Sequence, residues 1–109
     1  MKLSLFDFDN TLVETPYEDS PYLDTEESLD SDKWKFKFNE KTINNYKSES
    51  TDSSVVTVLL TNRIDSVQHC VKEILSSKKI TFDEEMFIKG KDGNRSKGKR
   101  VEKLLKKYE

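Results

Sequence analysis

The feature that most constrains this chain is a short apolar run near its start that leads directly into two acidic residues. Residues 3–6, Leu-Ser-Leu-Phe, are typical of a strand covered on both faces of a sheet. Asp7 and Asp9 follow this run, and Asn10-Thr11 closes it. Because ligand sites of α/β proteins form where parallel strands end, the sequence predicts an α/β fold with both acids at its site.

The spacing of Asp7 and Asp9 indicates phosphoryl-transfer chemistry. Two carboxylates this close repel each other unless a cation lies between them or one of them stays protonated. A Mg²⁺ ion, which prefers oxygen ligands, satisfies both carboxylates. One acid can then attack phosphorus while the other moves a proton, which divides a hard displacement into two easier ones. The alternative is a pair of solvated acids in a turn.

Length and composition predict one domain with a small core. The chain has 109 residues, of which 33% are hydrophobic and 37% charged. Residues 1–54 contain 13 acidic and 6 basic residues, whereas residues 89–109 contain 3 acidic and 9 basic ones. No stretch is as long as a membrane span, and the single cysteine, Cys70, lies on an apolar helical face where we expect it to be buried. These features predict a cytoplasmic or nuclear protein without a membrane partner.

We expect a single domain over residues 1–109, with residues 14–54 as a flexible insert or small cap between the first and second core strands. Residues 14–32 contain eight acidic residues and no Lys or Arg, a composition typical of a mobile loop. Residues 39–54 predict a weak helix followed by a loop.

An alternation of aromatic and basic residues follows the acidic stretch. Trp34, Phe36 and Phe38 alternate with lysines, which predicts a short strand or extended segment with one apolar face. Packing of these rings into the core is the favoured interpretation. The alternative is a lid or substrate platform over the site.

Four elements are expected after the insert. A β-branched apolar run at residues 55–60 predicts a central strand. Apolar residues recurring at helical spacing from Val67 to Leu75 predict an amphipathic helix of about four turns. Residues 86–88 predict a third strand, and a last helix is expected to begin near Ser96. The predicted order is β, insert, β, α, β, α.

Thr61 is the next candidate site residue because it ends the second predicted strand. A right-handed parallel arrangement would bring it to the same sheet edge as Asp7, where its hydroxyl could bind a phosphoryl oxygen. Its alternative role is that of a helix cap. A cation should also be present, since the acids and an incoming phosphate would otherwise crowd negative charge.

Residues 7–12, Asp-Phe-Asp-Asn-Thr-Leu, closely resemble the first motif of the haloacid dehalogenase-like (HAD) superfamily. In that motif the first Asp attacks phosphorus and the second acts as acid and base. The resemblance therefore assigns Asp7 as the nucleophile and Asp9 as the proton shuttle.

Two later segments resemble further motifs of the superfamily. Residues 59–63, Leu-Leu-Thr-Asn-Arg, resemble the second motif, with Asn62 where some relatives carry Gly. Residues 96–99 resemble the Lys-Gly turn that supplies the third motif in several branches. The resemblance therefore points to Lys97 as the catalytic cation, with Lys89 and Lys99 as alternatives. The competing interpretation is a solvated basic turn.

The resemblance implies a Rossmann-like parallel sheet in a three-layer α/β/α arrangement. It implies a phosphomonoester hydrolase that acts through an aspartyl-phosphate, with Mg²⁺ held by Asp7 and Asp9. The substrate would be a phosphorylated small molecule or nucleic-acid end. The residues expected to bind it are Asn10, Thr11, Asn62 and Arg63.

The fourth motif of the superfamily, one or two acids on a further strand, is absent from the sequence. Glu102 and Glu109 are the only later acids, and neither is placed to replace it. We therefore expect weak metal affinity and low or no turnover. A fragment, a product of a split gene, or a domain completed at its sheet edge by a second chain would each explain the absence. The alternative function is a non-catalytic phosphate- or RNA-binding regulatory remnant.

Within the superfamily, the sequence looks most like the HAD domain of fungal Swiss Army Knife RNA-repair proteins. The resemblance rests on the first motif together with Pro16, Trp34, residues 58–63 and a Lys before the last helix. It implies a phosphorylated RNA end as the ancestral substrate. The basic tail, residues 89–107, could then bind the RNA backbone, although a solvated helical face is the favoured interpretation.

Overall fold

The fold is built around β4 (Val55–Ile64), a strand whose first seven residues are all buried. The computed structural model describes residues 2–15, 25–30, 33, 35–90 and 96–108. β1 (Lys2–Phe6) lies parallel to β4 on one side, and β5 (Glu84–Ile88) lies parallel to it on the other. A strand with partners on both edges and cover on both faces needs apolar side chains throughout, which explains the apolar run in the sequence.

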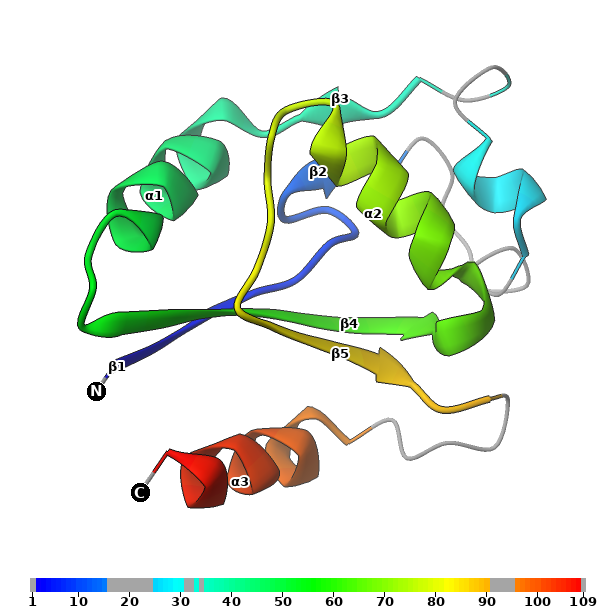
Figure 1. Cartoon of the computed structure of the whole chain (residues 1–109). Helices are drawn as coiled ribbons and strands as arrows, with labels where there is room; N and C mark the ends of the chain where they lie inside the picture. Colours follow the sequence, from blue (N-terminus) through cyan, green and yellow to red (C-terminus); the bar gives the residue numbers. More distant parts are fainter. Residues whose placement is uncertain (1, 16–24, 31–32, 34, 91–95, 109) are drawn as a thin grey trace.

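Helices cover both faces of this sheet (Figure 1). α1 (Glu40–Ser50) and α2 (Gln68–Ser76) lie on one face, and α3 (Lys97–Lys107) lies on the other. The Asn39 side chain caps α1, and the Ser96 hydroxyl caps α3 by accepting from the Lys99 backbone N–H at 3.3 Å. The predicted three-layer α/β/α architecture and the predicted order of the core elements are confirmed.

Between β1 and α1, the described residues form small elements beside α2. β2 (Val13–Glu14) pairs antiparallel with β3 (Lys37–Phe38), and a short 3-10 helix, η2, spans Glu27–Leu29. Phe36 and Phe38 pack against the core, as the favoured interpretation predicted. Trp34 and Pro16 lie outside the described residues, as does most of the acidic stretch.

The core has two parts, one on each face of the sheet. On the α1 and α2 face, the Tyr46 ring stands edge-on to Phe6 at 5.9 Å and to Phe82 at 5.2 Å between centroids. On the α3 face, Leu104 packs against Val56 and Val58. No helix among the described residues is long and apolar enough to cross a membrane.

Several boundaries differ from the sequence prediction. β4 does not end at Thr61 but continues to Ile64, because pairing with β5 resumes there after an irregularity in register. The predicted four-turn helix is shorter, since its first turn is the 3-10 helix η3 (Asp65–Val67). Cys70 is only partly buried, because its position on α2 faces a cavity rather than the sheet.

Candidate active site

Asp7 lies directly after β1 and is held from both sides. Its Oδ1 accepts a hydrogen bond from the Phe8 backbone N–H at 2.7 Å. Its Oδ2 lies 2.6 Å from Nζ of Lys97, the first residue of α3. The two side chains are 32% and 42% exposed, so this carboxylate and its cation remain open to an incoming anion. Residues 90 positions apart in the sequence therefore form one ion pair at the sheet edge.

Asp9 is paired with a buried arginine. The Arg63 guanidinium donates from Nη2 to Oδ1 at 2.6 Å and from Nε to Oδ2 at 2.9 Å. The Thr15 hydroxyl also donates to Oδ1, at 2.7 Å. Arg63 is wholly buried, whereas Asp9 is 21% exposed. This bidentate ion pair offsets part of the desolvation free energy of the buried guanidinium and fixes the orientation of the carboxylate.

Ser28 of η2 completes this network from the insert. Arg63 donates from Nη1 to the Ser28 Oγ at 2.8 Å, and the Ser28 hydroxyl donates to the Thr25 carbonyl at 2.6 Å. The 3-10 helix η2 is thus tied to Asp9 through Arg63. Sequence reasoning missed Ser28 and Thr15, because a single hydroxyl in a polar stretch carries no signal of a distant partner.

Thr61 lies one strand away from Asp7, as the predicted topology requires. Phe6 is paired with Leu59. Asp7 follows Phe6 by one residue, and Thr61 follows Leu59 by two, so both lie near the carboxyl ends of the two parallel strands. Thr61 is wholly buried, and its Oγ1 accepts from the Arg63 backbone N–H at 3.1 Å. Its hydroxyl is therefore shielded from solvent by neighbouring protein groups.

Arg100 is also buried, and unlike Arg63 it was not predicted from the sequence. It donates from Nη1 to the carbonyls of Thr61 at 2.7 Å and Met86 at 3.3 Å, and from Nη2 to the Asn62 Oδ1 at 2.6 Å. These contacts join the carboxyl ends of β4 and β5. The signal was its position four residues before Leu104, which places it on the helix face that packs on the sheet.

The remaining predicted residues lie around this edge. Asn10 adopts a left-handed backbone conformation, with φ of 57°, and its Oδ1 accepts from the Thr15 backbone N–H at 3.0 Å. Thr11 is partly exposed in the same turn. Lys89 and Lys99 are exposed, and in the described part of the chain neither one forms an ion pair with Asp7.

The side chains at this edge offer few ligands for a metal. No group of three or more His, Cys, Asp or Glu side chains placed to bind a metal occurs among the described residues. Asp7 and Asp9 are oxygen ligands of the kind that Mg²⁺ prefers, so the donor chemistry fits. Their two negative charges are already matched by Lys97 and Arg63. A Mg²⁺ ion would share Asp7 with Lys97 and would take its other ligands mainly from water or substrate.

Comparisons with known proteins agree with the fold and the motifs. Residues 7–107 match the model of HAD domain family 1 in Swiss Army Knife RNA repair proteins. No curated protein matches the sequence.

Two solved structures contain a similar fold. One is described as "Structure of Pnkp1/Rnl/Hen1 complex", with a TM-score of 0.73, 17% sequence identity, and coverage of 99% of this chain and 34% of that one. The other is described as "Structure of the Pnkp1/Rnl/Hen1 RNA repair complex", with a TM-score of 0.68, 18% identity, and coverage of 99% and 31%. The chain therefore spans about a third of the length of the chains that it matches. At this identity the likeness shows the α/β fold alone.

Proposed function

Because the chain belongs to HAD domain family 1 of the Swiss Army Knife RNA repair proteins, we propose that it hydrolyses phosphomonoesters with Asp7 as the nucleophile. One observation carries this proposal. Asp7 directly follows the parallel strand β1, with its Oδ2 only 2.6 Å from the Lys97 ammonium group, in a partly exposed position. A carboxylate beside a fixed cation can accept a phosphoryl group without excessive repulsion.

The proposed reaction has two displacements. Asp9 enters the reaction in its protonated form. An Asp7 oxygen attacks phosphorus, the bond from phosphorus to the leaving oxygen breaks, and Asp9 gives that oxygen its proton. Water then attacks the aspartyl-phosphate, Asp9 takes a proton from the water, and Asp7 and inorganic phosphate are released. Lys97 offsets charge on the transferred group throughout. Mg²⁺ bound to Asp7 and Asp9 would add to this charge neutralisation.

The contacts of Asp9 suggest which of its oxygens moves the proton. Oδ2 is engaged by Arg63 alone, whereas Oδ1 also receives the Thr15 hydroxyl. Oδ1 accepts from both Thr15 and the Arg63 Nη2, so the second lone pair of Oδ2 is better placed to carry the proton. Thr15 and Arg63 then keep their contacts with Oδ1 and hold the acid in place.

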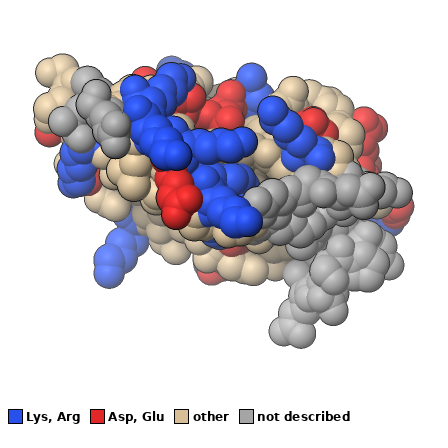
Figure 2. All heavy atoms as spheres, turned by 90° about the horizontal axis from the view of Figure 1, so that it is seen from below, with Lys and Arg blue, Asp and Glu red and all other residues tan. Residues whose placement is uncertain are grey.

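We also propose a phosphorylated RNA end as the substrate, with α3 binding the strand that leads to it. Lys99, Lys103 and Lys106 are exposed along α3, and no ion pair of theirs occurs among the described residues. Figure 2 shows basic side chains gathered on the face of the molecule that α3 forms. Since α3 begins at the lysine that binds Asp7, this basic face starts at the site. RNA phosphates are the natural partners of such a face.

A second candidate is a non-catalytic phosphate- or RNA-binding remnant. The observation in its favour is that Lys97 and Arg63 already neutralise both acids at the site. In either case a second chain could complete the sheet at β1, which has one partner among the described strands and leaves Leu5 43% exposed. We also propose a location in the cytoplasm or the nucleus.

Hydrolysis of a generic aryl phosphate, measured with and without Mg²⁺, tests the proposed reaction. The Asp7→Asn variant should lose Mg²⁺-dependent turnover, whereas the exposed control Glu102→Gln should retain it. Equal rates for Asp7→Asn and the unaltered protein would overturn the proposal. Phosphate binding that Mg²⁺ does not change, without turnover, would establish the second candidate.

A further inference from the structure

Ser28 contacts the candidate active site although it lies outside the three motifs. It belongs to η2, between β1 and α1, and is wholly buried. Its Oγ accepts a hydrogen bond from Arg63 Nη1 at 2.8 Å, and its hydroxyl donates to the Thr25 carbonyl at 2.6 Å. Since the hydroxyl proton is directed to Thr25, a lone pair of the same oxygen can be directed to Arg63. η2 therefore supplies a fixed acceptor for this guanidinium.

Arg63 transmits this contact to Asp9. Two of its nitrogens, Nη2 and Nε, donate to the two oxygens of Asp9 at 2.6 and 2.9 Å, and Nη1 donates to Ser28. The Phe8 ring lies beside the guanidinium, with 5.9 Å between its centroid and Cζ. Because a guanidinium is planar and rigid, its N–H groups cannot turn separately. A rotation that follows the loss of the Ser28 contact would therefore also move the two bonds to Asp9.

The orientation of Asp9 matters because it sets the direction of its proton. In the proposed reaction Oδ2 carries this proton, and the same oxygen accepts from Arg63 Nε at 2.9 Å. Proton transfer requires the acid to lie within hydrogen-bond reach of the leaving oxygen. A displacement of ~1 Å at a reacting group can lower a rate by ~10²-fold. The contacts of Arg63 can thus affect the reaction as well as stability.

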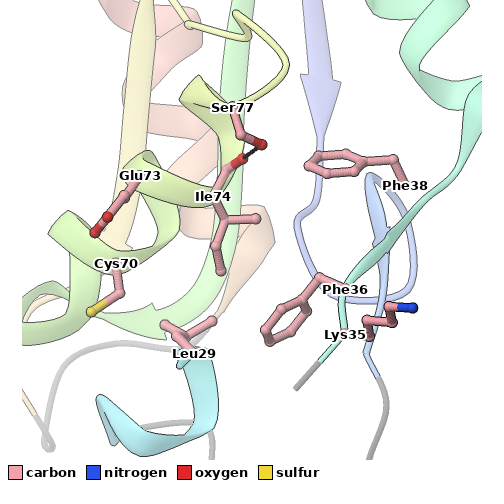
Figure 3. Close-up of a pocket in the computed structure, with 8 residues that line it drawn as sticks. All are labelled: Leu29, Lys35, Phe36, Phe38, Cys70, Glu73, Ile74 and Ser77. Carbon is pink, nitrogen blue, oxygen red and sulfur yellow. Dashed lines mark hydrogen bonds between the residues drawn. The ribbon is translucent and has the colours of Figure 1, made fainter. Parts of the chain in front are cut away.

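The apolar side of η2 borders a cavity. Leu29, the residue after Ser28, is buried in the core but also lines a space of about 380 Å³ between α2 and residues 35–38. Figure 3 shows Leu29 at this cavity together with Phe36 and Ile74. A side chain that borders a cavity has fewer van der Waals contacts than one packed on every side. The hydrogen bond from Arg63 is therefore an important part of what holds η2 at the site.

We propose that Ser28 is a positioning residue, which orients Asp9 for proton transfer by holding Arg63. The role is indirect, because the Ser28 hydroxyl meets the guanidinium rather than the acid. This inference rests on the proposed function, since it takes Asp9 as the acid and base. It makes η2 a part of the acid/base site.

Hydrolysis of an aryl phosphate by Ser28→Ala tests this role. Because Ser28 orients the acid and does not bind substrate in this proposal, kcat should fall by ~10–100-fold while KM stays the same. The matched control is Thr57→Val, which removes another buried hydroxyl of the protein, one that donates to Asp83 at 3.2 Å. Thr57→Val should lower the unfolding temperature and leave kcat unchanged. Thermal unfolding of both variants shows whether each is folded.

Hydrogen exchange at the Arg63 Nε–H gives a readout that does not need turnover. The signal is observed by ¹⁵N NMR and identified by its loss in Arg63→Lys. It should be protected in the unaltered protein and in Thr57→Val, and should lose protection in Ser28→Ala. Exchange in the unaltered protein as fast as in free arginine would overturn the proposal without any variant, so the test survives a Ser28→Ala that does not fold.

A double-mutant cycle shows whether Ser28 acts through Arg63. Ser28→Ala should lower kcat less in the Arg63→Lys protein than in the unaltered one, and an equal fold loss in both would overturn the proposal. An equal loss of kcat in Ser28→Ala and Thr57→Val would do the same. Loss of protection in Ser28→Ala, in a protein that hydrolyses no aryl phosphate, would support the link from η2 to Asp9 and reject the proposed reaction. Turnover that Ser28→Ala leaves unchanged would overturn the role of Ser28 and retain the reaction.

Discussion

Arg63 shows how much one side chain can connect at this site. From the sequence we predicted that it binds substrate, and that role stays a prediction. The structure places it wholly buried between Asp9 and Ser28, so it links the central strand, the first acidic turn and the insert. A buried guanidinium in this position has a structural role whatever else it does.

Removing the charge of Arg63 should destabilise the protein strongly. In Arg63→Gln, Asp9 loses both guanidinium contacts, and breaking such a pair typically costs ~3–5 kcal/mol when it is buried. Asp9 is 21% exposed, so we expect a value near the lower end, ~3 kcal/mol. Urea unfolding measures this loss. Arg63→Lys keeps the charge but cannot form the bidentate contact, so its free energy of unfolding should lie between those of the unaltered protein and Arg63→Gln. An unchanged free energy of unfolding in Arg63→Gln would contradict the prediction.

Removing the charge of Lys97 should affect turnover much more than stability. Its ion pair with Asp7 is partly exposed, and exposed pairs contribute only ~0–1 kcal/mol to stability. Its charge is nevertheless placed where a phosphoryl group would be transferred. Lys97→Met should therefore lower turnover of an aryl phosphate by ~10²–10³-fold, the typical effect of removing one charge-stabilising donor. Lys99→Met, on the same helix, is the matched control, and an equal loss in both variants would argue against a specific role for Lys97.

At the scale of elements, α3 is attached to the sheet at both of its ends. Arg100 binds the carboxyl ends of β4 and β5, while Lys107 and the Tyr108 hydroxyl bind Glu84 at the start of β5. Helix geometry allows this because residues 97, 100, 104, 107 and 108 recur on one side of the helix. The sequence pattern predicted the helix and its apolar contacts but not these polar ones.

The contact at Glu84 should make the attachment of α3 depend on pH. The hydrogen bond from Lys107, followed by that from Tyr108, lowers the pKa of Glu84 from its usual 4.5, and the same carboxylate raises the pKa of Lys107 and of Tyr108. For Glu84 the stabilisation is complete above pH 4.5 and is lost as pH falls through the lowered pKa. For Tyr108 and Lys107 it is complete below their usual values of 10.0 and 10.5 and is lost above them.

Thermal unfolding across pH, compared with Glu84→Gln, measures this contribution. The difference between the two proteins should be largest between about pH 5 and pH 10 and should shrink at both extremes. Because all three groups are close to solvent, high salt should also reduce it. A difference that stays constant across pH would show that Glu84 acts through packing rather than charge.

At the scale of the whole molecule, one outer layer of the fold is strongly basic. This layer is α3, which has six basic residues and one acidic one and lies on the opposite face of the sheet from α1 and α2 (Figure 1). Single-stranded RNA should therefore bind with a salt dependence set by the lysines of α3. Replacing Lys99, Lys103 and Lys106 by Gln should reduce the slope of log K against log salt by ~2, since each lost phosphate contact contributes ~0.7. Glu102→Gln should not reduce the slope, and an unchanged slope in the triple variant would place the RNA elsewhere.

Local patterns in the sequence were sufficient to predict most elements. The buried strand at residues 55–60, the amphipathic helices and the first acidic turn each depend on neighbours a few residues apart, so their signals are contained in short windows. Boundaries were less predictable. β4 extends to Ile64 because β5 pairs with it again there, and such pairing is a property of two strands rather than one.

The sequence by itself determined an α/β chain with two acids directly after its first strand and a basic last helix. The expectation that this strand is covered on both faces was wrong, because β1 lies at the edge of the described sheet and leaves Leu5 43% exposed. Only the tertiary structure decided which cation meets which acid. Lys97 reaches Asp7 across the sheet edge, and Arg63 is directed inward to Asp9 rather than outward to solvent. The physical reason is that periodicity reports which face of an element is buried, whereas ion pairs between distant residues depend on strand order and register. The cavity beside Phe36 has the same origin, because its walls come from three segments that meet only in the folded protein.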